Sequence, residues 1–463
     1  MNRISDELIA RIIKKSLSMG GDYADVYIEQ ERPLAIQLED DKIEKLSSGV
    51  DYGIGVRVIF GDKSAYAYSN DFSEDSLFTI AETVSRAVKE KERSPLTFDL
   101  RKLSPSVDFK IKYNPQDVDI KKKISLIENS NKAARGLSPK IKQVSVMYRD
   151  SIKNVCIASS DGTIAEDERI YTLALIQVIA SDGDVLQTGY EPVGGLVGFE
   201  LFEENPFEEI ARQAAQKALT LLSARKAPGG RMPVIISADA GGTMIHEAVG
   251  HGLEADLVHQ GLSVYSGKIG QQIASPLVTI IDDSTIPNKR GSFRFDDEGV
   301  KAQRTVLVDR GVLSGYMYDR LSAMKEAVSS TGNGRRQSYK DRPIPRMSNT
   351  FIAPGNEDPG NIIKSIDKGF FVRKMGGGQV NTVTGEFVFE VSEGCLIEKG
   401  GIGEPVRGAT LIGNGPEVLQ SIDMVGNDLG FAIGTCGKDA QGVPVSDAMP
   451  TVRIPEMVVG GEV

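Results

Sequence analysis

The sequence predicts an α+β protein in which two mixed α/β segments precede a mainly β C-terminal segment. Three observations support this fold class. The 463 residues leave room for two or three domains. The order helix, strands, helix is predicted twice in the first half of the chain. After residue 325 the chain is rich in glycine and short strands, and few helices are expected there.

The first predicted domain spans residues 1–94. Ser5 can cap an amphipathic helix that ends near Leu17, a pattern typical of a folded domain rather than of a signal peptide. Period-two patterns predict strands at 24–30, 34–39, 54–60 and 63–68. Helical spacing then predicts a closing helix over 73–89. A polar stretch that contains Pro95, Pro105 and Pro115 is interpreted as a linker.

The second predicted domain spans residues 116–224, with strands between a helix at 119–135 and a helix at 208–224. Those strands are predicted at 141–150, 154–159, 164–180 and 185–190. A linker with a Pro-Gly-Gly turn leads to the third domain, residues 231–463. It begins with a strand at 234–237, and Thr243 is the expected N-cap of the next helix. Further strands are predicted at 277–281, 304–308, 348–352, 386–391 and 395–398.

Composition narrows the class of protein. The net charge of -10 argues against direct binding of nucleic acid, which requires a basic surface. No run of 18 apolar residues is present, so no membrane-spanning helix is expected. The three cysteines, Cys156, Cys395 and Cys436, are odd in number and far apart, which predicts no disulfide framework. A reducing, cytoplasmic location fits this pattern.

All three histidines of the chain lie between His246 and His259. A histidine followed directly by Glu247 and then by a second histidine is typical of zinc hydrolases, where the histidines hold the metal and the glutamate acts as the base. However, His251 follows His246 by five residues, and a regular helix would place the two rings about 140° apart. A π-bulge near Gly250 would bring them together. The alternative is a short helix with one buried and one exposed histidine.

A catalytic zinc site needs a third protein ligand. Four candidates stay open on spacing alone. Glu254 and Asp256 are close in sequence to the histidine pair, and His259 lies beyond the expected end of the helix. Cys436, between glycines in a distant loop, offers a thiolate, but it could equally be a small buried residue.

Two other features each have two interpretations. Arg335 and Arg336 could bind a substrate carboxylate, or they could pair with the acidic run at 296–298, which is favoured because buried charges are usually neutralised. The glycines at 376–378 could let a substrate backbone approach closely, or they could form a plain loop.

The block His246-Glu247-Ala248-Val249-Gly250-His251, followed by Glu254 and Asp256, resembles the signature of the TldD branch of the TldD/PmbA metalloproteases. Further blocks are similar and follow in the same order; they lie at residues 296–299, 330–336, 346–350, 376–381, 384–387 and 434–442. The resemblance extends over nearly the whole chain, including the predicted strand at 53–58.

The resemblance implies a function for the C-terminal domain. Members of this family, historically named modulators of DNA gyrase, are zinc-dependent proteases. Carried over, it implies one Zn²⁺ per chain on His246, His251 and Cys436, with Glu247 as the general base. The mainly β C-terminal domain would then be catalytic and carry the metal-binding helix. The expected substrate is an extended peptide or unfolded protein that adds a strand to an exposed sheet edge.

The resemblance also implies a partner. TldD-type chains form heterodimers with a TldE- or PmbA-type subunit that lacks the metal motif, so a heterodimer is expected ahead of a homodimer. Two other functions stay open. One is a zinc hydrolase that acts on a non-peptide amide. The other is a non-catalytic regulatory module whose zinc is structural, in which case Glu247 would be dispensable.

Overall fold

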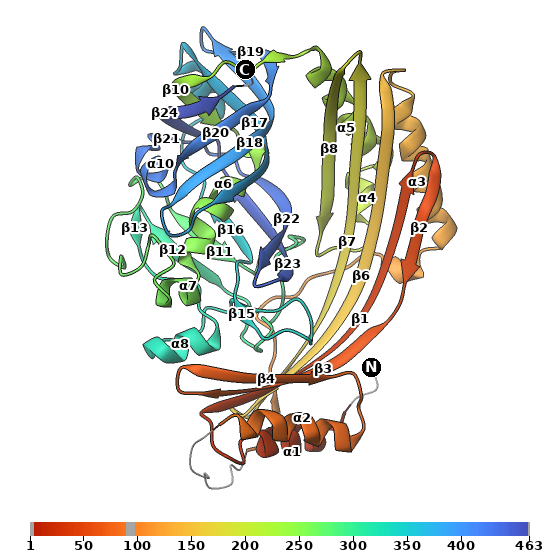
Figure 1. Cartoon of the computed structure of the whole chain (residues 1–463), viewed down its shortest axis with the longest axis vertical. Helices are drawn as coiled ribbons and strands as arrows, with labels where there is room; N and C mark the ends of the chain where they lie inside the picture. The colour runs from red at the N-terminus through yellow and green to blue at the C-terminus, as the bar shows by residue number, and fades with distance from the viewer. Residues whose placement is uncertain (1–3, 89–97, 462–463) are drawn as a thin grey trace.

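The computed structural model describes residues 4–88 and 98–461, so Pro95 and the predicted boundary at residue 94 lie outside the described residues. Its first half is built on one sheet of eight strands in the order β4-β3-β1-β6-β7-β5, with β2 paired to β1 and β8 to β7 (Figure 1). The strands are β1 (Tyr23–Glu39), β2 (Lys42–Ser48), β3 (Asp51–Phe60), β4 (Lys63–Ser69), β5 (Arg101–Lys102), β6 (Ile141–Ser159), β7 (Thr163–Asp182) and β8 (Val185–Gly195).

The long strands β1, β6 and β7 run through both predicted N-terminal units. The strands predicted separately at 24–30 and 34–39 are one strand, β1, and those at 141–150 and 154–159 are one strand, β6. The α+β class is confirmed, since the chain combines helices with sheets that are largely antiparallel. The three-domain division stays a prediction, and the sheet shows that its first two parts share one set of paired strands.

Two helix pairs cover one face of this sheet. Helices α1 (Asp6–Ser16) and α2 (Glu74–Arg86) pack at one end, and α3 (Ile120–Arg135) and α5 (Phe207–Ser223) pack at the other (Figure 1). Ser5 caps α1 by accepting a hydrogen bond from the Leu8 amide, as predicted. In β1, even-numbered apolar residues such as Val26 and Ile36 enter the two helix-covered cores. Because side chains alternate along a strand, these positions share one face.

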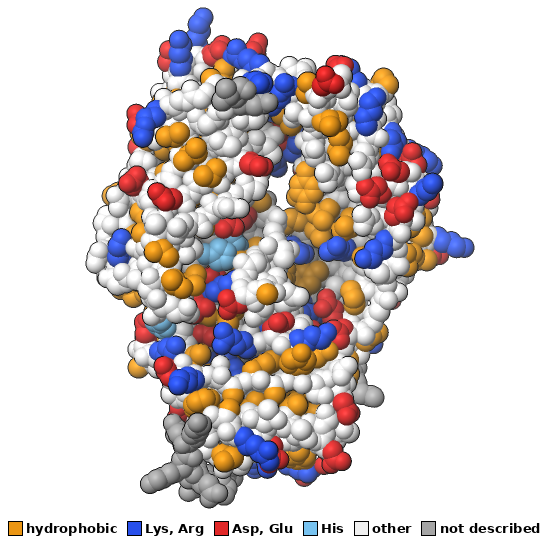
Figure 2. Space-filling model, in the orientation of Figure 1, with side chains coloured by type: hydrophobic (Ala, Val, Ile, Leu, Met, Phe, Trp, Pro, Cys, Tyr) orange, Lys and Arg blue, Asp and Glu red, His pale blue; other side chains and the backbone are white. Residues whose placement is uncertain are grey.

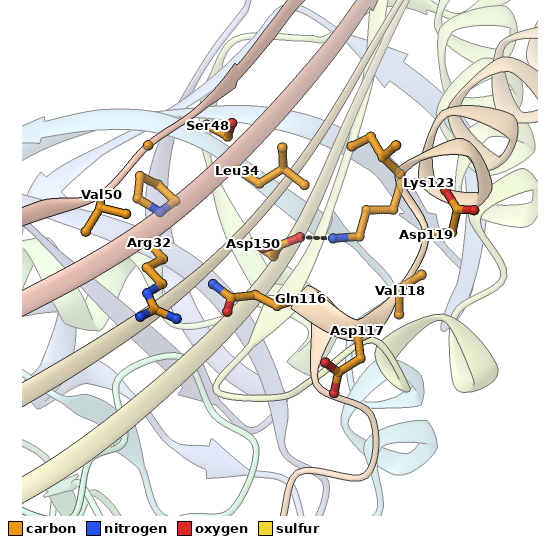
Figure 3. Close-up of a pocket in the computed structure, with 13 residues that line it drawn as sticks. Arg32, Leu34, Ser48, Val50, Gln116, Asp117, Val118, Asp119, Lys123 and Asp150 are labelled. Atoms are coloured by element: carbon orange, nitrogen blue, oxygen red, sulfur yellow. Dashed lines mark hydrogen bonds and ion pairs between the residues drawn. The ribbon is translucent and has the colours of Figure 1, made fainter. Parts of the chain in front are cut away.

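A pocket of about 680 Å³ lies beside the start of α3, on this helix-covered face (Figure 3). Leu34 of β1 and Val50 line it together with the buried ion pair between Lys123 and Asp150, whose atoms Nζ and Oδ2 are 2.6 Å apart. Asp150 also accepts a hydrogen bond from the Tyr148 hydroxyl at 2.6 Å. None of the predicted metal ligands lines this pocket.

The opposite face of the sheet is polar and packs against the C-terminal domain through buried charges. Arg169 of β7 donates to the Asp297 carboxylate at 2.8 Å and to the Phe295 carbonyl at 2.8 Å. Arg57 of β3 lies 2.7 Å from Glu298. The backbone amide of Arg336 also donates a hydrogen bond to Asp297 Oδ2 at 2.8 Å. Buried charge pairs, together with a small apolar cluster of Tyr27, Val155, Ile157 and Tyr339, therefore hold this face of the sheet against the C-terminal domain.

Arg336, but not Arg335, pairs with the acidic run at 296–298, which was the favoured interpretation for both arginines. Arg336 is buried among acidic neighbours, with its guanidinium on the Asp297 carbonyl at 2.9 Å and 3.8 Å from Asp25. Arg335 is buried too, but it donates to the backbone carbonyls of Met347 and Pro444 instead of to the acidic run. Both side chains are therefore occupied within the protein, which leaves neither free for a substrate carboxylate.

Replacing Arg169 with alanine should destabilise the protein by about 3–5 kcal/mol, because Asp167 and Asp297 would keep buried charges without this partner. Arg225 is the matched control. It lies 3.8 Å from Glu398 and 3.5 Å from Glu404, and all three side chains are exposed. Its alanine variant should change stability by less than about 0.5 kcal/mol. Denaturant unfolding measures both. Equal losses would show that the buried pairs contribute no more than surface pairs.

The C-terminal domain contains two larger sheets packed around the main apolar core. One is eight-stranded: β17 (Lys368–Val380), β10 (Gly230–Ile236), β24 (Val452–Gly460), β20 (Ala409–Asn414), β18 (Glu386–Glu398), β19 (Gly401–Arg407), β9 (Arg225–Lys226) and β21 (Met424–Val425). The other has the order β13 (Val312–Leu313), β12 (Arg304–Asp309), β11 (Ile280–Asp283), β16 (Asn349–Ile352), β23 (Gln441–Met449) and β22 (Gly430–Lys438).

Helices are few after residue 325, as expected. After α8 (Arg320–Glu326), the described residues contain only α9 (Pro359–Lys364) and α10 (Gly415–Ser421) as α-helices. Throughout residues 4–88 and 98–461, no helix has both the length and the apolar character that crossing a bilayer requires.

Candidate metal centre

The histidine segment begins at a close contact between a glycine turn and two strands. Gly241 has φ +70°, and a Cβ there would lie 2.4 Å from the Ala432 Cβ of β22. A Cβ on Gly242 would lie 2.2 Å from the Ala448 amide of β23. Only glycine therefore lets this turn lie against the β22–β23 hairpin. Gly242 occupies the cap position and α6 (Thr243–Ile245) starts one residue later, so the prediction of Thr243 as N-cap was wrong.

The five residues His246–Gly250 form one turn of π-helix, which confirms the predicted bulge. The extra residue brings the rings of His246 and His251 to a centroid distance of 5.1 Å, nearly perpendicular to each other. Gly250 has ordinary helical dihedrals, so the bulge does not need its conformational freedom. A Cβ at Gly250 would lie 2.0 Å from the Met347 sulfur, and it is this close packing that requires glycine.

Cys436 of β22 lies beside the two histidines. One ligand atom each from His246, His251 and Cys436 lies within 4.8 Å of the others, and all three residues are buried. Cys436 Sγ is 3.5 Å from His251 Nε2. The strand is held there by its antiparallel partner β23, which itself pairs with β16. The structure thus brings together all three ligands that the family resemblance implied.

Carboxylates lie behind both histidine rings. Glu254 Oε2 is 2.9 Å from His251 Nδ1, and Asp447 Oδ2 is 3.7 Å from His246 Nδ1. Nδ1 of His251 thus contacts the carboxylate while its Nε2 faces Cys436. This arrangement matches the carboxylate–histidine pairs found behind metal ions, which fix ring orientation. Asp447 was missed from the sequence because it is one of many acidic residues in β-rich segments, without a motif around it.

The other candidates for a third ligand have different contacts. Glu254 supports His251, as described. Asp256 accepts a hydrogen bond from Lys438 Nζ at 2.6 Å. His259, the last residue of α7 (Ala255–His259), pairs with Glu326 at 2.5 Å. None of the three belongs to the group of converging ligand atoms.

The electrostatics of the cluster favour a thiolate. Burial alone would raise the pKa of Cys436, but hydrogen bonds and charge from His246 and His251 outweigh it and lower that pKa to about 5. Burial opposes the charged form of His251, yet Glu254 and Cys436 hold its pKa well above the usual value. The pKa of Glu254 falls to about 2 despite burial, because Lys438 and His251 stabilise its charge. A thiolate beside imidazoles is a donor set that suits zinc.

Glu247 directly follows the first histidine and is half-buried. Its charge and, above all, burial raise the pKa of Asp447 to about 6, although His246 acts in the other direction. Thr243 lines a large cleft. Glu247 itself is not among the residues that line this cleft.

This cleft, about 950 Å³, separates the N-terminal sheet from the C-terminal domain. Its walls include residues 186–194 of β8 on one side, and 374–377 of β17 and 431–433 of β22 on the other. Among the described residues, β8 pairs only with β7 and β22 only with β23, so each has one edge without a strand partner. On β22, the Gly434 and Cys436 carbonyls accept hydrogen bonds from Arg290 and Arg346. In space-filling view the molecule is hollowed here, and histidine side chains reach the surface on the same face (Figure 2).

The chain is similar to known proteins over nearly its whole length. Family models match residues 24–90 as "PmbA/TldA metallopeptidase domain 1", 113–222 as the central domain and 229–461 as the C-terminal domain. A "Metalloprotease TldD homolog" of Haemophilus influenzae is 40% identical over 95% of this chain and 93% of its own. A "Zinc metalloprotease TldD homolog" of Saccharolobus solfataricus is 27% identical, covering 98% of this chain and 100% of its own.

A solved structure described as TldE from Thermococcus kodakarensis has the same fold, with a TM-score of 0.77 at 19% identity over 98% of this chain and 99% of its own. The family models and the curated relatives identify the chain as a metallopeptidase, and the buried His-His-Cys cluster lies in the part that the C-terminal model matches. The chain belongs to the PmbA/TldD metallopeptidase family.

Proposed function

We propose that this chain is a zinc-dependent protease that cleaves extended or unfolded peptides, with the metal held by His246, His251 and Cys436. The observation that carries the proposal is the convergence of these three buried ligand atoms within 4.8 Å, from segments that are 185 residues apart. A thiolate with two imidazoles fits zinc by softness and by ligand number, and it leaves one coordination position open. The relative named as a zinc metalloprotease supports the choice of metal.

When bound there, zinc would polarise the scissile carbonyl and lower the pKa of the attacking water toward neutrality. The remaining steps fall to side chains of this chain. Glu247 accepts a proton from the attacking water and returns it to the leaving amine. Glu254 holds His251 through Nδ1, and Asp447 lies behind His246.

The substrate would bind through its backbone in the cleft beside the site. The edges of β8 and β22 that have no strand partner can each pair with an extended peptide, and Cys436 lies on β22 itself. Gly376 and Gly377 line the same cleft at irregular positions of β17, which favours their role in close backbone approach. Such a site accepts an unfolded chain but excludes a folded domain, which cannot offer a free strand.

The proposed partner is a TldE- or PmbA-type subunit, with a homodimer as the alternative, and the proposed location is the cytoplasm. The fold shared with TldE supports a pairing of like-shaped chains. Co-expression with a TldE-type chain, followed by determination of the mass of the complex, would test this pairing.

Peptide cleavage tests the proposed function directly. The zinc-loaded chain, alone and with a TldE-type partner, should cleave a panel of unstructured peptides, lose activity with a chelator and regain it with zinc. A parallel panel of small non-peptide amides tests the rival hydrolase. Cleavage of the amides but not of the peptides would replace the protease assignment, and no cleavage of either by a zinc-loaded complex would favour a structural zinc.

The ionisation of Cys436 gives a test in the metal-free chain. Its pKa is lowered from 9.0 to about 5, so the thiol form dominates below that pH and the thiolate above it. Ultraviolet thiolate absorbance should therefore rise as the pH increases through about 5. Cys436→Ala should lack this transition, and Cys395 should not mask it because its own pKa is raised. A transition only at alkaline pH would rule out the thiolate described above.

A further inference from the structure

Lys438 lies two residues after Cys436 on β22 and is buried behind the metal cluster. Residues two apart on a strand point to the same side, so the lysine shares the side of β22 that faces the histidine segment. Its side chain is only 8% exposed. Nζ lies 3.0 Å from Glu254 Oε2, 2.6 Å from Asp256 Oδ1 and 3.1 Å from the Pro345 carbonyl. All of its recorded partners are therefore acceptors.

Glu254 links this lysine to a metal ligand. Its side chain is fully buried, and its Oε2 contacts both Lys438 Nζ and His251 Nδ1. Its other oxygen, Oε1, is buried without a hydrogen-bond partner. The two contacts on Oε2 thus fix where this carboxylate lies. An unbroken path runs from Cys436 along β22 to Lys438, across to Glu254, and on to the ring of His251.

We propose that Lys438 is a positioning residue that sets the distance between the cysteine strand and the histidine segment by clamping Glu254 against His251. The inference rests on the proposed zinc site and adds a residue to it. Lys438 touches neither the converging ligand atoms nor the cleft-lining residues, so its effect passes through Glu254. Partners of this kind typically contribute a factor of about 10–100 to metal affinity.

Charge explains why a lysine is needed at this position. Glu254 and Asp256 are both acidic and both close to Nζ, so without the lysine two carboxylates would repel each other in a buried place. Glu254 would then be free to turn away from His251. The ring of His251 would lose its fixed orientation, and the three proposed ligands would bind a metal ion less tightly.

The test measures zinc affinity by competition with a chelator, without any substrate. Lys438→Met keeps an unbranched side chain only one atom shorter and removes the charge, and its zinc Kd should rise about 10–100-fold. Lys438→Gln, which keeps a hydrogen-bond donor, is measured as well in case the methionine variant does not fold. Arg342→Met is the matched control. Arg342 lies 3.8 Å from Asp439 of the same β22–β23 hairpin, and both side chains are exposed to solvent. Its Kd should stay within about twofold of the wild type.

A double variant shows whether the lysine acts through Glu254. Glu254→Gln alone should also weaken zinc binding, and Lys438→Met combined with Glu254→Gln should be no weaker than the poorer single variant, because both changes break one path. Additive losses would reject that path. Thermal melting of the metal-free variants separates a general loss of stability from a specific loss of affinity.

The outcomes separate this inference from the proposed function. Zinc Kd values within twofold of the wild type in both Lys438 variants would overturn the positioning role, even if peptides are cleaved. Weakened zinc binding in a chain whose wild type cleaves no peptide would support the positioning role and reject the protease assignment.

Discussion

Glu247→Gln is expected to reduce peptide cleavage by about 10²–10⁴-fold, the usual contribution of a general base. Glutamine has the same shape as glutamate but cannot accept the proton of the attacking water. The zinc content should not change, because Glu247 is not among the converging ligand atoms. Initial rates on an unstructured peptide, measured beside elemental analysis of the same sample, check both parts of this expectation.

Glu404→Gln is the matched control. Its side chain is 74% exposed on the surface strand β19, so this variant should cleave peptides at the wild-type rate. Full activity in Glu247→Gln would instead leave the zinc without a catalytic base and favour the regulatory alternative. Loss of zinc in that variant would mean that Glu247 acts as a ligand rather than as a base.

Cys436→Ala and His251→Ala are each expected to lose most of their zinc, measured by elemental analysis after purification without added metal. Removing one of three ligands leaves too few donors for a stable site. The loss of zinc binding should also remove the stability that the wild type gains when zinc binds. With free zinc at about 1,000 times its Kd, the wild type should gain about 4 kcal/mol on binding, and neither variant should show this gain.

Cys395→Ala is the control for the cysteine variant. Cys395 is half-buried in β18 and does not belong to the ligand cluster, so its variant should keep both the zinc and the gain in stability. Zinc retained by Cys436→Ala would point to Glu254 or Asp256 as a replacement ligand. Zinc absent from every sample, even after it is added back, would contradict the metal site as a whole.

Local features of the site could be predicted from the sequence, because local geometry determines them. A spacing of five residues between His246 and His251 requires an extra residue in the helical turn if both rings are to meet, and the structure contains that π-turn. The spacing alone could not select Cys436, since β22 reaches the histidines only through the pairing of sheets far along the chain. Asp447 and Lys438 were missed for the same reason: each is an ordinary charged residue until β23 brings Asp447 beside His246 and β22 brings Lys438 beside Glu254.

The single N-terminal sheet shows the same limit. Two strands were predicted in this part of the chain, at 24–30 and 34–39, one on each side of Pro33. In the structure Pro33 lies where the neighbour of β1 changes from β3 to β2, since pairing with β3 ends at Glu31 and pairing with β2 begins at Leu34. The missing amide therefore interrupts no regular pairing on that side. Alternation of residues predicts which face a side chain occupies, but not which strand lies beside it.

The separation of the ligands along the chain has a consequence for synthesis. Cys436 lies near the end of the C-terminal domain, and its strand reaches the histidines only when β23 has paired with both β22 and β16. A ribosome-bound chain that has completed only the histidine segment would hold two imidazoles and no thiolate. The proposed metal site would thus be completed only after β16, β22 and β23 have been made and paired.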